Sequence, residues 1–186
     1  HGVDDFGLIT CTAPGDPTAY AKRLGTSLHG LRKVAAADMC PMPIQSGWQQ
    51  CQCVDQVIKA FLFDHGQNPW NHLPAEGVDH EFNLVAQQKA SILVAIKGQQ
   101  QIGFGIFYHA DTLPSQYLQY SNQRPAIYIA EVVVHREFAG QGIGHRLLSL
   151  IIDQAPDLGG SMLLIDRHEE NLASAGMMRK AGFTEL

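Results

Sequence analysis

The chain has 186 residues, a length that supports one globular domain with its own hydrophobic core. Hydrophobic residues make up 45% of the chain and charged residues 17%, which excludes a disordered tail and a fibrous repeat. The chain has 13 Lys and Arg against 18 Asp and Glu, and the formal charge of -5 argues against binding nucleic acid through bulk positive charge. No apolar run approaches the roughly 18–20 residues that span a bilayer, so we expect no membrane association.

The four cysteines, Cys11, Cys40, Cys51 and Cys53, are too few for a disulfide-dense scaffold of this size. Cys51 and Cys53 are spaced more closely than the C-x-x-C pairs of zinc sites, and no H-x-x-x-H pair lies near them. No secretion signal is recognisable in the opening residues. We therefore expect reduced cysteines, no bound metal and a cytoplasmic location.

Hydrophobic periodicity and turn residues predict the elements of the first half of the chain. In chain order these are a strand within 3–12, a helix over 18–28, a strand over 31–35, short helical turns over 38–50, a helix over 54–65, a loop over 66–80 and a helix over 79–88.

The second half is more regular. We expect a hairpin of strands 91–97 and 102–109, a long loop over 110–125, a strand over 126–134, a loop over 135–141, a helix over 142–154, a strand over 161–166 and a helix over 171–181 that Gly182 caps. The last strand–helix–strand unit should be parallel, with a right-handed crossover. The order predicts an α/β fold in which helices cover a mixed sheet.

Three alternate glycines, Gly140, Gly142 and Gly144, stand where the strand over 126–134 leads into the next helix. The first turn of a helix has unpaired N–H groups and the positive end of the helix dipole, and glycines let phosphates approach those groups. The spacing does not fit G-x-G-x-x-G, because His145 occupies the sixth position, and the Gly-Lys-Ser/Thr of a P-loop is missing. The alternative is that these glycines merely turn the chain.

The stretch from Val134 to Gly144 resembles the signature of the GNAT superfamily of acyl-CoA-dependent N-acetyltransferases. That signature is a strand ending in Val, a short loop, and R/Q-x-x-G-x-G/A opening a helix. Gly142 and Gly144 match it, whereas Ala139 stands where the family has Arg or Gln. Downstream, Asn171, Ser174, Lys180, Gly182 and Phe183 stand at the corresponding places of the family pattern N-x-x-A-x-x-x-Y-x-K-x-G-F, with Ser174 at the place of its Ala.

The resemblance covers about residues 28–186 and implies the GNAT fold. This fold has a mixed central sheet with antiparallel N-terminal strands, flanking helices and a splayed parallel pair, here 126–134 and 161–166. Residues 1–27 would then be an N-terminal extension, and the domain lacks the family's usual last strands. We expect residues 6–12, from the same chain or from a second copy in a homodimer, to cover the edge of strand 161–166.

The family relation further implies acetyl-CoA as cosubstrate and no metal. The positions that match its coenzyme site are Val132, Val133, Val134, Ala139, Gly140, Gln141, Gly142, Ile143, Gly144, His145 and Asn171. In the family, an amine attacks the thioester directly and catalysis rests mainly on positioning. The acceptor would be a primary amine of a small molecule or a peptide, and the sequence does not identify it.

Glu131 is the candidate general base, and Tyr128 occupies a position where some relatives place their carboxylate. The tyrosine that often protonates the leaving thiolate is Met178 here, and a thioether donates no proton. Tyr117, Tyr120 or water would have to replace it, or the thiolate leaves unaided. Two other classes stay open, a non-catalytic acyl-CoA-binding or regulatory module and a plain interaction domain.

Overall fold

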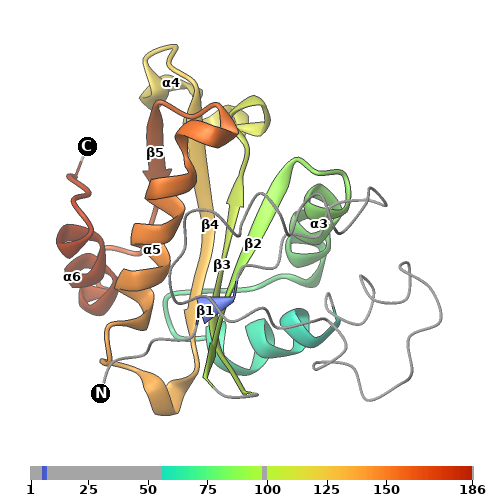
Figure 1. Ribbon diagram of the computed structural model, residues 1–186, viewed down its shortest axis with the longest axis vertical. Helices are drawn as coiled ribbons and strands as arrows, with labels where there is room; N and C mark the ends of the chain where they lie inside the picture. Colours follow the sequence, from blue (N-terminus) through green and yellow to red (C-terminus); the bar gives the residue numbers. More distant parts are fainter. Residues whose placement is uncertain (1–5, 8–55, 98–99, 186) are drawn as a thin grey trace.

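In the computed structural model, the described residues are 6–7, 56–97 and 100–185 (Figure 1). Their strands form a single sheet in the order β1-β2-β3-β4-β5. The strands are β1 (Phe6–Gly7), β2 (Ala90–Lys97), β3 (Gln100–Tyr108), β4 (Ala126–Val134) and β5 (Met162–Ile165). Neighbouring strands are antiparallel except β4 and β5, which are parallel, so the predicted mixed sheet is confirmed.

Helices cover both faces of this sheet (Figure 1). On one face lie α3 (Ala75–Ala86) and the helix over 56–61, which continues as a π-helical turn, η2 (Leu62–Gly66). On the other face lie α5 (Ile143–Gln154) and α6 (Leu172–Lys180). Each face has its own hydrophobic core, and β2, β3 and β4 contribute side chains to both cores.

The spacing of apolar residues in α5 explains why this segment forms a helix that packs on the sheet. Ile143, Leu147, Leu148 and Ile151 form one stripe, and each is at most 2% exposed. Burial of each such side chain contributes about 1.5–3 kcal/mol. Helix α6 ends at Lys180, and Gly182 caps it as predicted, with a φ of +94° that suits the left-handed position after the helix. The N–H of Phe183 donates to the carbonyl of Met178 at 3.0 Å, which completes the cap.

Two stretches that we expected to be loops contain helix. Helix α3 begins at Ala75, within the predicted loop over 66–80, because Pro74 takes the extended N-cap position and the helix starts directly after it. The predicted loop over 110–125 contains three short elements, η3 (Ala110–Thr112), η4 (Ser115–Tyr117) and α4 (Leu118–Ser121). The remaining short turns are η5 (Arg136–Phe138) and η6 (Pro156–Leu158).

The prediction for residues 6–12 requires a correction. Phe6 and Gly7 pair with Ala95 and Val94 of β2, at the opposite edge of the sheet from β5, so these two residues do not cover β5 of their own chain. Residues 8–12, and the elements expected over 18–28, 31–35 and 38–50, lie outside the described residues.

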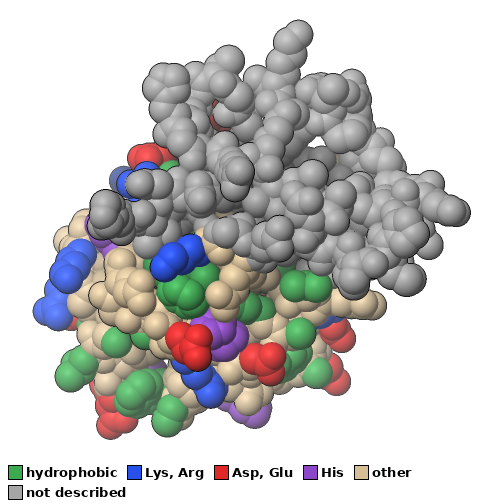
Figure 2. Space-filling view, turned by 60° about the horizontal axis from the view of Figure 1, so that its bottom comes forward, with side chains coloured by type: hydrophobic (Ala, Val, Ile, Leu, Met, Phe, Trp, Pro, Cys, Tyr) green, Lys and Arg blue, Asp and Glu red, His purple; other side chains and the backbone are tan. Residues whose placement is uncertain are grey.

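Charged and apolar side chains are mixed on the described surface that Figure 2 shows. Among residues 6–7, 56–97 and 100–185, no helix is long and apolar enough to cross a membrane. The same residues contain no cluster of three or more His, Cys, Asp or Glu that could hold a metal ion.

Candidate active site

The parallel strands β4 and β5 separate halfway along β4. Their pairing runs from Ala126–Met162 to Ile129–Ile165 and stops there, while β4 continues to Val134. Residues 130–134 of β4 therefore have no partner on β5, in agreement with the splayed pair of strands that we expected. A cavity of about 260 Å³ fills the gap. It is lined by residues 65, 66, 68, 70, 71, 130–134, 165–168, 171, 174, 177 and 178.

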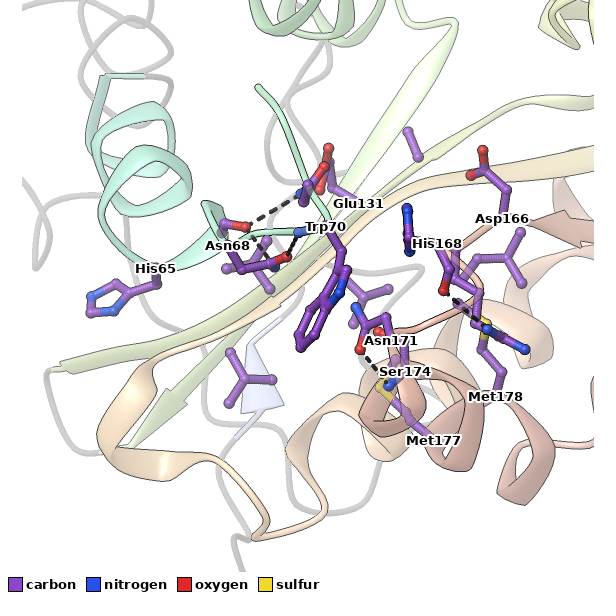
Figure 3. A pocket seen from close by; sticks show the side chains of 18 residues that line it. His65, Asn68, Trp70, Glu131, Asp166, His168, Asn171, Ser174, Met177 and Met178 are labelled. Atoms are coloured by element: carbon purple, nitrogen blue, oxygen red, sulfur yellow. Dashed lines mark hydrogen bonds between the residues drawn. The ribbon is translucent and has the colours of Figure 1, made fainter. Parts of the chain in front are cut away.

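A β-bulge in β4 sets the direction of the Glu131 side chain. Ile106 of β3 pairs with Glu131 and Phe107 pairs with Ile129, which leaves Ala130 as the extra residue. Ile129 and Val132 pack in the core beneath α5, whereas Ala130 packs in the core beneath α3. Because of the extra residue, Glu131 also faces the α3 side, where its carboxylate accepts a hydrogen bond from the Asn71 side chain. It also lines the cavity (Figure 3).

The surroundings of Glu131 make its carboxyl a base suited to neutral pH. Burial raises the pKa of Glu131 to about 7, and the charge of Asp166 acts in the same direction. The hydrogen bond from Asn71 opposes this shift in pKa because it favours the ionised form. A carboxyl with a pKa near the working pH can both accept and release a proton.

One wall of the cavity is an asparagine-rich turn over 66–71. The carbonyl of Gly66 accepts hydrogen bonds from the side chains of Asn68 at 3.2 Å and Asn71 at 3.3 Å. The backbone N–H of Trp70 donates to Oδ1 of Asn68 at 2.9 Å. The turn thus holds the indole of Trp70, which is 42% exposed, against the cavity (Figure 3).

Helix α6 forms the opposite wall, with Asn171, Ser174, Met177 and Met178 lining the cavity (Figure 3). Oδ1 of Asn171 accepts the N–H of Ser174 at 3.1 Å and so caps the helix. Met178 presents a thioether where a proton donor would otherwise stand. Met178 stands at the tyrosine position of the family signature and lines the cavity, but its side chain has no proton to donate.

Tyr128 lies outside the residues that line the cavity. Its hydroxyl donates to Oδ1 of Asp166 at 3.0 Å, and the Tyr117 hydroxyl donates to Oδ2 of the same carboxylate at 2.8 Å. The two rings are stacked with centroids 4.4 Å apart. Burial is the main cause that raises the pKa of Tyr128 and of Tyr117, so neither hydroxyl ionises near neutral pH. Tyr120 is 45% exposed on α4 and does not line the cavity either.

The glycine-rich loop follows the unpaired end of β4 and opens α5. Gly140 and Gly142 have φ of +76° and +81°, and a Cβ added at either position would meet no atom within 4 Å. The first helical hydrogen bond runs from the N–H of Arg146 to the carbonyl of Gly142. The N–H groups of residues 143–145 therefore have no acceptor within the helix. Gly144 is tightly packed, because a Cβ there would collide with the sulfur of Met177.

The structure brings most of the predicted site residues into one region. Glu131, Val132, Val133, Val134 and Asn171 line the same cavity. The loop of Ala139, Gly140, Gln141 and Gly142 is exposed, and with Ile143, Gly144 and His145 it lies just beyond β4 and outside the cavity lining. Nδ1 of His145 is buried and has no hydrogen-bond partner among the described residues.

Sequence analysis missed Asn71 and Asp166. Asp166 directly follows β5, and Asn71 follows η2 by five residues; a polar residue in such a place is a weak signal. Trp70, by contrast, could be noted as a large aromatic residue in a loop segment. Only the three-dimensional turn shows that its side chain faces the cavity.

The family model for the Acetyltransferase (GNAT) family matches residues 55–183. The chain therefore belongs to the GNAT acetyltransferase family, as its glycine loop and the pattern in α6 predict. No curated protein sequence matches the chain significantly.

Solved structures share the fold at low sequence identity. An aminoglycoside antibiotic 6'-N-acetyltransferase from Acinetobacter haemolyticus is 18% identical, with a TM-score of 0.54 over 70% of this chain and 86% of that one. An aminoglycoside acetyltransferase from an uncultured soil metagenomic sample, in complex with sisomicin, is 17% identical, with a TM-score of 0.53 over 74% and 84%. AAC(6')-Iy in complex with the bisubstrate analogue CoA-S-monomethyl-acetylneamine is 15% identical, with a TM-score of 0.55 over 74% and 86%.

Proposed function

We propose that this protein transfers an acetyl group from acetyl-CoA to a primary amine, with Glu131 as the general base. The observation that carries the proposal is the gap between β4 and β5. There, residues 130–134 have no partner on β5, and the half-buried side chain of Glu131 lines the cavity beside them.

The residues around the gap fit the coenzyme. The open space over Gly140 and Gly142 leaves room for a diphosphate next to the N–H groups of residues 143–145. Nδ1 of His145, which has no hydrogen-bond partner within the described part of the chain, is a further polar group at this helix end. Residues 130–134 would bind the pantetheine arm as a further strand does, and their backbone N–H groups could polarise a carbonyl. Ala139 has no polar side chain for this purpose, so the backbone carries the binding.

Acetyl-CoA supplies a thioester, whose carbonyl carbon forms a bond to the amine nitrogen as its bond to sulfur breaks. The nitrogen, which carries one proton too many after the attack, passes that proton through water to the departing thiolate. Glu131 accepts a proton from the acceptor ammonium, which leaves the neutral amine that can attack. Trp70 and the turn over 66–71 would position the acceptor from one wall and α6 from the other. Protonated Glu131 returns its proton to solvent after the product has left.

The leaving thiolate has no tyrosine beside it at Met178. Thiols have an ordinary pKa of about 8.5, so a thiolate is a tolerable leaving group that water can protonate. Tyr117 is engaged with Asp166 and Tyr128 through its hydroxyl, and it does not line the cavity. We therefore assign no tyrosine to this step.

The acceptor that fits this cavity best is a small amine or the end of a peptide. The neighbour in complex with sisomicin and the neighbour in complex with a coenzyme A–neamine analogue support such an acceptor. The second candidate function is a module that binds acyl-CoA without catalysis, and Met178 at the cavity wall is the observation that favours it.

The two candidates are separated by measuring free thiol release from acetyl-CoA with a panel of primary amines. Release that requires both the protein and an amine supports the transferase. Binding of coenzyme A in calorimetry without release on any amine would support the binding module instead.

A further inference from the structure

Glu81 is a carboxyl on the buried side of α3 that the proposed mechanism does not use. It belongs to the same stripe of the helix as Val78, Phe82 and Val85, which are at most 3% exposed. Its Oε2 atom is buried and has no hydrogen-bond partner among the described residues. Burial of an ionised carboxylate without a hydrogen-bond partner raises the free energy of the folded state. The neutral acid is therefore the favoured form of Glu81.

Glu81 and Glu131 belong to elements that border the same core, the one beneath α3. Val78, Phe82 and Val85 of α3 pack in the same cluster as Ala130, the bulge residue next to Glu131. The charge of Glu131 acts on Glu81, and the charges of both act on Tyr108 of β3.

The carboxyls of Glu81 and Glu131 differ in the hydrogen-bond donors around them. Glu131 accepts a hydrogen bond from Asn71, which favours its ionised form, whereas Oε2 of Glu81 accepts none from the described residues. Asp166 is the other charged group that acts on Glu131. When one of the pair is ionised, the charge therefore resides on Glu131.

We propose that Glu81 is a positioning residue that holds a proton behind Glu131, so that the buried pair carries one negative charge and that charge stays on the carboxyl facing the cavity. The inference rests on the proposed function. In the cycle, the proton of the acceptor ammonium goes to Glu131, and Glu81 keeps its own proton throughout. The proton on Glu131 leaves to solvent through the cavity.

The electrostatics agree with this assignment. Burial, followed by the charge of Glu131, raises the pKa of Glu81 to about 8. Glu81 is thus mostly neutral at pH 7 and becomes the second negative charge only in more alkaline solution. The pair should titrate in two coupled steps.

The kinetic test compares kcat/KM across pH 5.5–9.5 in the wild type and Glu81→Gln, with one amine. Gln imitates the neutral acid and cannot ionise. The midpoint of the acid limb of kcat/KM should therefore stay within about half a pH unit of the wild-type midpoint. The kcat/KM of the wild type divided by that of the variant should change about threefold or more between pH 7 and 9. Glu81→Lys places a cation beside Glu131 and should lower the acid-limb midpoint by about one pH unit. Glu76→Lys, at an exposed position on α3, is the matched control and should leave the midpoint in place.

A second measurement needs no turnover and so separates this inference from the proposed function. Carbon NMR of the labelled glutamate carboxyls in the full chain should show two groups that titrate above pH 6, and Glu131→Gln should lower the midpoint of Glu81. A Glu81 that titrates below pH 6, or whose midpoint ignores Glu131→Gln, overturns the inference. So does an acid limb that moves by more than one pH unit in Glu81→Gln, because Glu81 would then be charged in the working enzyme.

Discussion

Replacing Glu131 by Gln should abolish most of the activity and, at alkaline pH, stabilise the fold. The carboxyl has an ordinary pKa of 4.5 and a folded-state pKa of about 7. Because the folded state binds the proton more tightly, the carboxyl lowers stability as pH rises from 4.5 to 7, and the full cost is present above pH 7. That difference in pKa corresponds to about 3 kcal/mol. Gln removes the charge and can still bond to Asn71.

The assay combines urea unfolding at pH 5 and pH 8 with thiol release at pH 8. Glu131→Gln should unfold with a free energy up to about 3 kcal/mol higher than the wild type at pH 8, and with little difference at pH 5. Its rate should fall by about 100-fold to 10,000-fold, the usual contribution of a general base. Glu76→Gln, at an exposed site on α3, controls for the loss of a surface charge. A variant that keeps its activity, or that is destabilised equally at both pH values, would refute the reasoning.

Three other substitutions test the site and its frame. Gly142→Val forces a side chain into a φ of +81° and into the open space above the helix end, so coenzyme A affinity should fall at least about tenfold in calorimetry, whereas Gly176→Ala on α6 should leave it unchanged. Equal affinities in the two variants would count against the loop as the diphosphate site. Tyr117→Phe loses the hydroxyl hydrogen bond to Asp166 and should lower the free energy of unfolding by about 1 kcal/mol, yet leave the pH–rate profile unchanged. A lost alkaline limb would make this tyrosine the missing acid. Gly103→Ala places its Cβ 2.9 Å from the carbonyl oxygen of Val133, so it should cost about 1–3 kcal/mol in urea unfolding, and an unchanged midpoint would contradict that packing.

The elements with strong local signals could be predicted from the sequence. The apolar stripe of α5, the β-forming run of β4 and the glycine that ends α6 each depend on residues close together in the chain. The start of α3 at Ala75 could not be predicted in this way, because Gly77 and the neighbouring Pro and His residues resemble a loop. Packing of Val78, Phe82 and Val85 against the sheet stabilises the helix despite them.

The candidate site was only partly predictable for a related reason. Glu131 could be selected because it lies on the strand of the family signature. The bulge at Ala130 decides which face Glu131 takes, and no alternation pattern reveals a bulge in advance. Asn71 and Glu81 approach Glu131 from segments distant in the sequence, so their contribution to its charge state depends on the tertiary fold.

The central claim is that the gap between β4 and β5 brings a thioester and an amine together beside Glu131. Mass spectrometry of reactions that contain protein, acetyl-CoA and a panel of primary amines tests it most directly, with free thiol counted in parallel. We predict an acetylated amine and an equal amount of thiol, with half-maximal kcat/KM on the acid side near pH 7 and loss of both products in Glu131→Gln. Thiol release without an acetylated amine, or acetylation that persists in Glu131→Gln, would contradict the account.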